Sequence, residues 1–321
     1  MEIPTSLRSA LDALAEGLPQ TPLARDAQAL SERYRNQSAN GARLVQNDAE
    51  ATAYALSRMP ATYGAVFSAL RWTAEHTGAE FQTLLDAGAG TGAACWAALS
   101  ALSGIREITC IEREGSMRRI GQRLMEAGPD ALRRARWLSF DLTAGTLPHR
   151  ADIVMASYVL SEMAEGDRAK AADALWDAAD KLLLVVEPGT PAGFKKLAAL
   201  RERLISRGAH LATPCPHEGP CPVPPGDWCH FSCRIPRSRV HRALKGGDAP
   251  YEDEKFCYMA FSRTPCQRPV SRVLRHPQTE PGRVTLTLCT PEGIQKCAVM
   301  KREGERFKRA RKTDWGDGTK I

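Results

Sequence analysis

The order of apolar and polar positions divides the chain into an N-terminal helical part and a longer part in which strands and helices alternate. Up to about residue 80, apolar side chains recur at helical spacing, first from Leu7 to Leu14 and again from Ala53 to Leu70. From Phe81 onward, short apolar runs typical of buried strands alternate with helical segments. This β-α order predicts a mostly parallel α/β sheet with helices on both of its faces.

The predicted elements suggest four regions. We expect strands at 83–86, 107–112, 135–140, 151–156 and 182–187, and helices at 93–102, 116–127, 169–181 and 194–207. The rhythm breaks after residue 209, and strands resume at 255–262, 284–289 and 294–301. The regions are then an N-terminal helical region (1–80), a Rossmann-like core (81–208), a Cys-rich metal-binding insertion (209–236), and a part (237–321) that completes the sheet and ends in a hairpin and a basic tail.

The first predicted strand runs into a glycine-rich turn, Asp86-Ala-Gly88-Ala-Gly90-Thr-Gly92, and then into a helix. Glycines let the backbone approach a ligand closely, and the helix N-terminus adds a favourable dipole. We therefore expect Gly88, Gly90 and Gly92 to bind a nucleoside-containing cofactor. The same glycines also fit the dinucleotide fingerprint, so an NAD-dependent oxidoreductase with a zinc site remains an alternative.

Three carboxylates lie at the ends of three successive predicted strands: Asp86, Glu112 and Asp141. Because parallel strand ends meet at one edge of the sheet, these side chains should converge on one crevice. A carboxylate at Asp86 suits the cationic amino-acid end of S-adenosylmethionine better than a pyrophosphate. Glu112 could accept the ribose hydroxyls and Asp141 the adenine amino group. The set predicts S-adenosylmethionine bound to a class I methyltransferase core, with Ser157 at the end of the fourth strand as a further binding residue.

The segment after the fourth predicted strand gives no catalytic residue. It reads Ser157-Tyr-Val-Leu-Ser-Glu162 and lacks the Asn or Asp, Pro-Pro and aromatic signature of base methylation. Methyl transfer can proceed mainly by positioning the acceptor against the sulfonium, so this absence does not exclude an enzyme. The sequence leaves two hypotheses open, a methyltransferase and a non-catalytic binding module.

Four cysteines crowd into the predicted insertion. Cys215, Cys221, Cys229 and Cys233 are spaced C-x5-C-x7-C-x3-C among prolines, glycines and histidines. A single cysteine is usually a small buried apolar residue, but this clustering favours a metal site. Structural zinc sites more often use closer cysteine pairs, and iron–sulfur clusters also take four thiolates. Spacing alone leaves both metals open.

The excess of positive charge lies near the C-terminus. Residues 235–321 carry 19 of the 44 Lys and Arg but only 10 of the 37 Asp and Glu. Arg pairs with phosphate in two-point geometry, so this surplus indicates a polyanionic partner. Phe307 and Trp315 could add rings on which bases stack, although a plain solvated basic helix is the alternative. The residues expected to bind RNA are Arg302, Arg306, Lys308, Arg309, Arg311 and Lys312.

No segment predicts secretion or a membrane span. The purely apolar runs, such as 182–186, are far shorter than the roughly 20 residues that a membrane helix needs. The N-terminus lacks a basic stretch followed by an apolar one. Ten cysteines without a secretory signal indicate a reducing compartment rather than disulfides. We therefore expect a cytoplasmic protein, and we expect a monomer.

Several of these segments together resemble the methyltransferase-like assembly proteins of the small ribosomal subunit, a family found in bacteria and mitochondria. The resemblance runs from about residue 54 to residue 317. It rests on the glycine turn and on four further segments: Tyr54-Ala-Leu-Ser-Arg-Met-Pro60-Ala-Thr-Tyr63, Cys215-Pro-His217 with Cys221-Pro222, Trp228-Cys229-His230-Phe231, and Arg311-Lys-Thr-Asp-Trp315-Gly-Asp317.

The resemblance implies a [4Fe-4S] cluster held by four cysteines and association with small-subunit rRNA during ribosome assembly. Cys215, Cys221 and Cys229 match three of the family's ligands. The fourth lies in a downstream strand, a context that Cys289 matches in Leu286-Thr-Leu-Cys289. Cys233 is nearer in sequence and remains the alternative. The weaker candidates are Cys257, Cys266 and Cys297.

Overall fold

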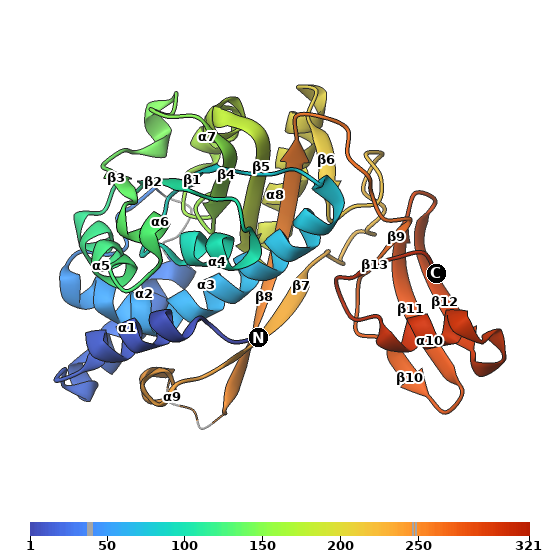
Figure 1. Ribbon diagram of the computed structural model, residues 1–321, viewed down its shortest axis with the longest axis horizontal. Coiled ribbons are helices and arrows are strands. Elements are labelled where there is room, and N and C mark those ends of the chain that lie inside the picture. The colour runs from blue at the N-terminus through green and yellow to red at the C-terminus, as the bar shows by residue number, and fades with distance from the viewer. Residues whose placement is uncertain (37–40, 246, 248) are drawn as a thin grey trace.

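The structure, a computed structural model, describes residues 1–36, 41–245, 247 and 249–321. The elements form a large mixed sheet covered by helices and a small antiparallel sheet at the C-terminal end (Figure 1). Within the described ranges, none of the helices has an apolar stretch long enough to cross a bilayer.

The large sheet has eight strands. They are β1 (Thr83–Ala87), β2 (Glu107–Ile111), β3 (Arg136–Leu138), β4 (Ala151–Ser157), β5 (Ala179–Pro188), β6 (His210–Thr213), β7 (Phe231–Pro236) and β8 (Tyr251–Ser262). Their order is β3-β2-β1-β4-β5-β8-β6, with β7 also paired to β8. Strands β1 to β5 pair in parallel, and β8 runs antiparallel to β5, β6 and β7. This order is that of a class I methyltransferase, which confirms the expected fold class.

Side chains alternate between the two faces of the large sheet, as the pleat requires. In β4, Ile153 and Met155 face one core, and Val154 and Ala156 face the other. The first core is covered by α4 (Ala93–Ala101), α5 (Gly115–Met125) and the N-terminal helices, and the second by α7 (Glu165–Ala178) and α8 (Pro191–Ser206). Strands buried on both faces read as continuous apolar runs, which is why the sequence located them.

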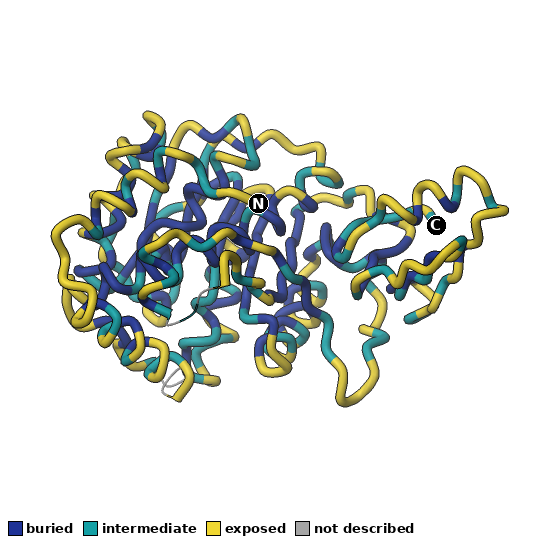
Figure 2. The backbone as a smooth tube through the Cα atoms, turned by 90° about the horizontal axis from the view of Figure 1, so that it is seen from below, coloured by how far each residue is buried: buried dark blue, intermediate teal, exposed yellow. Residues whose placement is uncertain are grey.

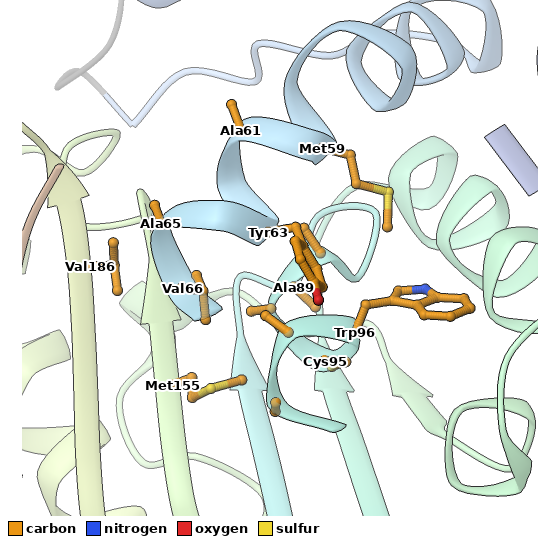
Figure 3. Packing of buried hydrophobic residues seen from close by; sticks show 14 of the residues in the cluster. Met59, Ala61, Tyr63, Ala65, Val66, Ala89, Cys95, Trp96, Met155 and Val186 are labelled. Carbon is orange, nitrogen blue, oxygen red and sulfur yellow. The ribbon is translucent and has the colours of Figure 1, made fainter. Parts of the chain in front are cut away.

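The N-terminal region is helical, as expected, and its helices contribute residues to the core on one face of the large sheet. It contains α1 (Thr5–Ala15), α2 (Gln20–Asn36) and α3 (Asp48–Thr77). Asn47 caps α3 by accepting a hydrogen bond from the backbone N–H of Glu50 at 2.9 Å. Most of α3 is buried, and its Met59, Tyr63 and Val66 gather with Trp96 of α4 over the strands (Figure 3). Helix α3 is therefore part of the layer that covers the sheet.

The segment after residue 209 differs from the expected uninterrupted insertion. It begins and ends in strands of the large sheet, β6 and β7, so the irregular cysteine-bearing loop is only 214–230. Helix α7 also ends at Ala178 rather than at residue 181, because the chain enters β5 directly at Ala179. The first 250 residues also contain three short helices: α6 (Asp130–Arg133), η1 (Leu142–Ala144) and α9 (Arg239–Lys245).

The C-terminal part forms a second sheet instead of only completing the first. Its strands are β9 (Ser271–Val273), β10 (Gln278–Glu280), β11 (Arg283–Thr290), β12 (Gly293–Met300) and β13 (Gly318–Thr319), with η2 (Lys301–Glu303) and α10 (Glu305–Lys312) after β12. Alternate apolar residues of β11 pack against Phe307 and Ala310 of α10. Figure 2 shows this smaller body beside the large one, with exposed segments along its outer edge.

Candidate functional site

The turn between β1 and α4 needs glycine at the positions that the sequence singled out. Gly88, Gly90 and Gly92 have φ values of 75°, 55° and 84°, a region that residues with a Cβ rarely adopt. A Cβ on Gly88 would also lie 2.6 Å from Cγ2 of Val159. The turn is thus held close to the loop that follows β4, at the carboxyl edge of the sheet.

A cavity opens at this edge and gathers most of the predicted cofactor residues. Gly88, Gly90, Glu112, Asp141 and Ser157 all line it. Its empty space, counted to the open mouth, is about 800 Å³. The N-terminal helices close its other side with two aromatic rings, those of Tyr34 and Tyr54.

Asp86 lies in a smaller pocket that shares Gly88, Gly90 and Ser157 with the cavity. Its side chain is almost fully buried, and burial raises the pKa of Asp86 to about 7. The Cys95 thiol donates to Oδ2 at 3.3 Å. Among the residues that the structure describes, neither Oδ1 of Asp86 nor the buried Ser157 hydroxyl has a hydrogen-bond partner. Two unsatisfied polar groups therefore border the same space, and a polar ligand would satisfy them.

Glu112 supports the glycine turn from the end of β2. Its Oε2 accepts a hydrogen bond from the Gly90 N–H at 2.8 Å, and its Oε1 accepts one from the Glu114 N–H at 2.8 Å. Burial raises the pKa of Glu112, although these two backbone hydrogen bonds oppose the rise. Since each carboxylate oxygen can accept a second hydrogen bond, Glu112 can still accept the hydroxyl groups of a ribose.

Asp141 is more exposed than the other two carboxylates. It begins η1 and accepts hydrogen bonds from the N–H and the hydroxyl of Thr143, and Arg113 lies 3.5 Å from its Oδ2. Burial raises the pKa of Asp141, but the Thr143 hydrogen bonds and the charge of Arg113 outweigh it, and the pKa is lowered.

Gly92, unlike Gly88 and Gly90, lines neither pocket and serves as the N-cap residue of α4.

Two acidic residues that were not predicted from the sequence lie in or contact the loop after β4. Glu187 is fully buried and accepts hydrogen bonds from the Leu160 N–H at 3.0 Å and from the Ser161 hydroxyl. Burial raises its pKa to about 7. Glu162 lines the cavity, and burial raises its pKa to about 8. Glu187 directly follows the apolar run 182–186 of β5. An acidic residue at the end of a buried strand is the same signal that predicted Glu112.

The thiols of the cysteine-bearing loop and of β11 influence one another. Burial raises the pKa of Cys229 well above its ordinary value, and the charges of other thiolates, including Cys215, Cys289 and Cys221, add to the rise. Burial likewise raises the pKa of Cys289 to about 12, again with contributions from Cys215 and Cys221. The Cys289 sulfur atom lies 3.9 Å from Nε2 of His217, so β11 of the small sheet contacts the loop.

Cys233 lies elsewhere. Burial raises its pKa to about 12, and the charge of Glu254 adds to the rise. Its sulfur atom faces α3, where a Cβ on Gly64 would lie 3.2 Å from it. Cys257 lies nearer to the loop, and its thiol donates to the Cys229 carbonyl at 3.1 Å.

The cysteine side chains are not arranged as the ligands of a single metal ion. Among the residues that the structure describes, no three or more Cys, His, Asp or Glu side chains form a group that could hold a metal ion. Zinc at about 2.3 Å from each thiolate would need sulfur atoms within about 4 Å of one another.

The predicted RNA-binding residues lie on and beside α10. Arg306 and Lys308 pair with Glu303 and Glu305, whereas the other four have no carboxylate partner within the described ranges: Arg302, Arg309, Arg311 and Lys312. Phe307 is buried in the small core, so its ring is not free to stack on a base. Trp315 is half-buried beside His230 and His276.

Residues 48–320 match the family described as "Mitochondrial small ribosomal subunit Rsm22". The chain belongs to the Rsm22 family.

Two curated relatives match this Rsm22 family member over most of its length. The human "Ribosome assembly protein METTL17, mitochondrial" is 28% identical over 256 residues, which cover 74% of this chain and 55% of that protein. The "Rsm22-cox11 tandem protein 2, mitochondrial" of Schizosaccharomyces pombe is 22% identical over 333 residues, which cover 85% of this chain and 43% of that protein. The chain thus spans about half the length of the curated relatives that it matches.

Solved methyltransferase structures resemble the Rsm22 chain at low identity. A putative RNA methyltransferase from Pyrococcus horikoshii has 12% identity and a TM-score of 0.39, covering 80% of this chain and 99% of that one. Magnesium protoporphyrin IX methyltransferase from Synechocystis, with S-adenosylmethionine bound, has 15% identity and a TM-score of 0.43, covering 78% and 99%.

The expectation of a cytoplasmic protein is wrong. The matched family and both curated relatives are mitochondrial by description, which points to mitochondria rather than the cytoplasm. The error has a physical reason. Free thiols indicate only that a protein resides in a reducing compartment, and the cytoplasm is not the only such compartment.

Proposed function

We propose that this chain is an assembly factor of the small ribosomal subunit that binds S-adenosylmethionine, holds a [4Fe-4S] cluster and contacts rRNA. The observation that carries the proposal is the position of Cys289. Its strand, β11, belongs to the small sheet with the basic helix, yet its sulfur atom lies 3.9 Å from Nε2 of His217 in the loop that carries Cys215, Cys221 and Cys229. A single inorganic centre at this point would fix the RNA-facing part to the cofactor-binding fold.

The cofactor pocket supports S-adenosylmethionine through its unsatisfied groups. Asp86 offers a buried carboxylate oxygen and Ser157 a buried hydroxyl, both without partners, and these suit the ammonium and carboxylate of the methionine end. Glu112 would accept the ribose hydroxyls, and Asp141 the adenine amino group. A buried carboxylate beside the glycine turn would repel a pyrophosphate, so an NAD-dependent oxidoreductase is disfavoured.

When bound, a cluster would supply a rigid cross-link, because its four ligands come from two separate sheets. Cys215, Cys221 and Cys229 would hold it from the large body and Cys289 from the small one. The small sheet would then present the unpaired cations of α10 and η2 to rRNA from a fixed position. Phosphate contacts of this kind orient a protein on RNA without reading its sequence.

Methylation of rRNA is a second candidate function, and Glu162 is the observation that favours it. Its carboxyl group lines the cofactor cavity, and burial raises its pKa to about 8. A carboxyl group with a raised pKa can exchange a proton with an acceptor near neutral pH. Glu162 would be the base in that reaction.

The test replaces the cell's own copy with variants and follows maturation of the small subunit by sedimentation. We expect Cys289→Ser to block maturation and Glu162→Gln to support it. Should Glu162→Gln block maturation while still binding S-adenosylmethionine in calorimetry, the methyltransferase function would replace the binding function. Normal maturation with Cys289→Ser would refute the structural role of the cysteine centre, and tighter binding of NAD than of S-adenosylmethionine would refute the cofactor assignment.

A further inference from the structure

Asp86 and Cys110 lie side by side in the parallel pair of β1 and β2. Residues paired in this way project from the same face of a sheet, and here that face is the one that α4 covers. Cys95 of α4 lies in the same core (Figure 3). Asp86 is 1% exposed and both cysteines are 0% exposed. One carboxyl group and two thiols therefore meet inside the protein.

The three side chains form a hydrogen-bonded chain. The Cys95 thiol donates to Oδ2 of Asp86 at 3.3 Å, and the sulfur atoms of Cys95 and Cys110 lie 3.6 Å apart. Burial raises the pKa of both thiols, so each keeps its proton near neutral pH. A thiol has only one proton to donate. Because Cys95 gives its proton to Asp86, the proton between the two sulfur atoms comes from Cys110.

The second oxygen of the Asp86 carboxyl group is left for a ligand. A buried polar oxygen without a hydrogen bond costs free energy, so most such oxygens have a partner. Among the described residues, the Cys95 thiol is the only donor to Asp86, and Oδ1 has no partner. Asp86 also lines the smaller pocket together with Gly88, Gly90 and Ser157. The thiol thus holds one oxygen, and the other remains available to a group in that pocket.

We infer that Cys95 is a positioning residue of the cofactor site, which holds Oδ2 of Asp86, keeps Oδ1 for the ammonium group of S-adenosylmethionine and sets the pH range in which the cofactor binds. This inference rests on the proposed binding of S-adenosylmethionine. The ammonium group pairs with the ionised carboxylate, and a hydrogen bond to that carboxylate favours its ionised form. Cys110 polarises the Cys95 thiol and so strengthens this hydrogen bond.

Other titratable groups near the pocket affect the same equilibrium. Burial raises the pKa of Asp86 to about 7, the Cys95 hydrogen bond opposes the rise, and the charge of Glu112 adds to it. Tyr54 reaches the pocket from α3, and burial raises its pKa to about 12, so it stays neutral. Glu162 lines the larger cavity, where burial raises its pKa to about 8. The test therefore changes the thiols and leaves Glu112 and Glu162 in place.

The test measures S-adenosylmethionine binding by calorimetry at several pH values on both sides of the pKa of Asp86. It compares the full chain with Cys95→Ala, Cys95→Ser and Cys110→Ala. Cys233→Ala is the matched control, because Cys233 is also a buried cysteine of this core but its sulfur atom faces Gly64 of α3. Urea unfolding without the cofactor, at the same pH values, gives a second measure of the pH at which Asp86 ionises.

We expect Cys95→Ala to raise the pH at which the affinity levels off by roughly one unit, which below that pH is a loss of about tenfold. Cys110→Ala should raise it by less, because the Cys95 thiol still donates to Asp86. Cys95→Ser keeps a donor, so its value should equal that of the wild type or lie below it. Cys233→Ala should have the wild-type value. The pH range over which the free energy of unfolding falls should shift in the same order.

The outcomes separate this role from the cofactor assignment. A wild type that does not bind S-adenosylmethionine would refute the assignment itself. Binding that levels off at the same pH in the wild type and in Cys95→Ala would refute only the positioning role. The same holds if Cys95→Ser behaves like Cys95→Ala, since the volume of the side chain would then matter and the donated proton would not. Should Cys95→Ala fail to fold, an unshifted value in Cys110→Ala would refute the role.

Discussion

Cys289 of β11 and Arg272 of β9 are direct cross-strand partners in the small sheet. Directly opposed residues project from the same face of a sheet, so the thiol and the guanidinium approach the cysteine-bearing loop together. Arg272 binds the Pro214 carbonyl there, one residue before Cys215. The small sheet therefore brings a thiol and a cation to the same loop.

The first prediction concerns the identity of the fourth ligand. Cys289→Ser should lose most of the iron and sulfide of the anaerobically purified protein, because the proposed cluster takes its fourth ligand from Cys289. Cys233→Ser should keep both, since Cys233 faces α3 and Glu254 instead. Elemental analysis and the visible absorption of the protein measure the difference.

The substitutions Cys289→Ser and Cys233→Ser control for each other. Both replace a buried cysteine by serine, so a general loss of stability would affect both variants alike. Full cluster content in Cys289→Ser, or loss in Cys233→Ser alone, would assign the ligand to Cys233 and contradict the geometry.

The second prediction concerns the glycine turn. Gly88→Ala should weaken S-adenosylmethionine binding roughly tenfold or more, because a left-handed φ costs a residue with a Cβ about 1–2 kcal/mol and the new Cβ would press on Val159. Gly166→Ala is the control, since a Cβ there meets open space. Calorimetric titration gives both affinities. Equal affinities in the two variants would place the cofactor away from this turn.

The sequence predicted the cofactor half of the molecule better than the cysteine half. Strands buried on both faces give continuous apolar runs, and the carboxyl ends of parallel strands meet at one edge. Glu112 and Asp141 could therefore be placed in one cavity from their positions alone. Glu187 lies at the end of its strand in the same way, although it was not among the predicted residues.

The small sheet could not be predicted in this way. Its strands β9, β10 and β13 have only two or three residues each, too short for a periodic signal. The proximity of Cys289 to Cys215 depends on contacts 74 residues apart in the sequence, which no local pattern encodes. Phe307 was misjudged because its apolar side chain packs under α10, a contact that the sequence of a basic tail conceals.

The third prediction concerns the RNA-binding surface. Changing Arg302, Arg309 and Arg311 together to Gln should weaken rRNA binding and lower the slope of log affinity against log salt by about 2, since each lost phosphate contact with a single strand removes about 0.7. The control changes three exposed arginines of the large body, Arg106, Arg123 and Arg136. Filter binding at several salt concentrations measures both slopes. A slope that falls equally in both triple variants would mean that the protein binds RNA by its overall charge.

The fourth prediction concerns Asp86 and pH. Burial raises the pKa of Asp86 from 3.8 to about 7. Between these values the folded protein holds a proton that the unfolded chain has released, so the stabilising contribution of Asp86 is complete below the lower value and is lost as the pH rises through the higher one. Without ligand, the free energy of unfolding should fall over this range, and it should fall less in Asp86→Asn.

S-adenosylmethionine should have the opposite pH dependence, because its ammonium group pairs with the ionised carboxylate. Below about pH 7, binding must expel one proton from Asp86, so the affinity should rise by up to about tenfold per pH unit. Above the pKa it should level off, and in Asp86→Asn this rise should be absent. Glu162→Gln separates the contribution of the other titrating carboxyl group in the cavity. If Asp86→Asn keeps the full rise and Glu162→Gln loses it, the ammonium group is held by Glu162 instead.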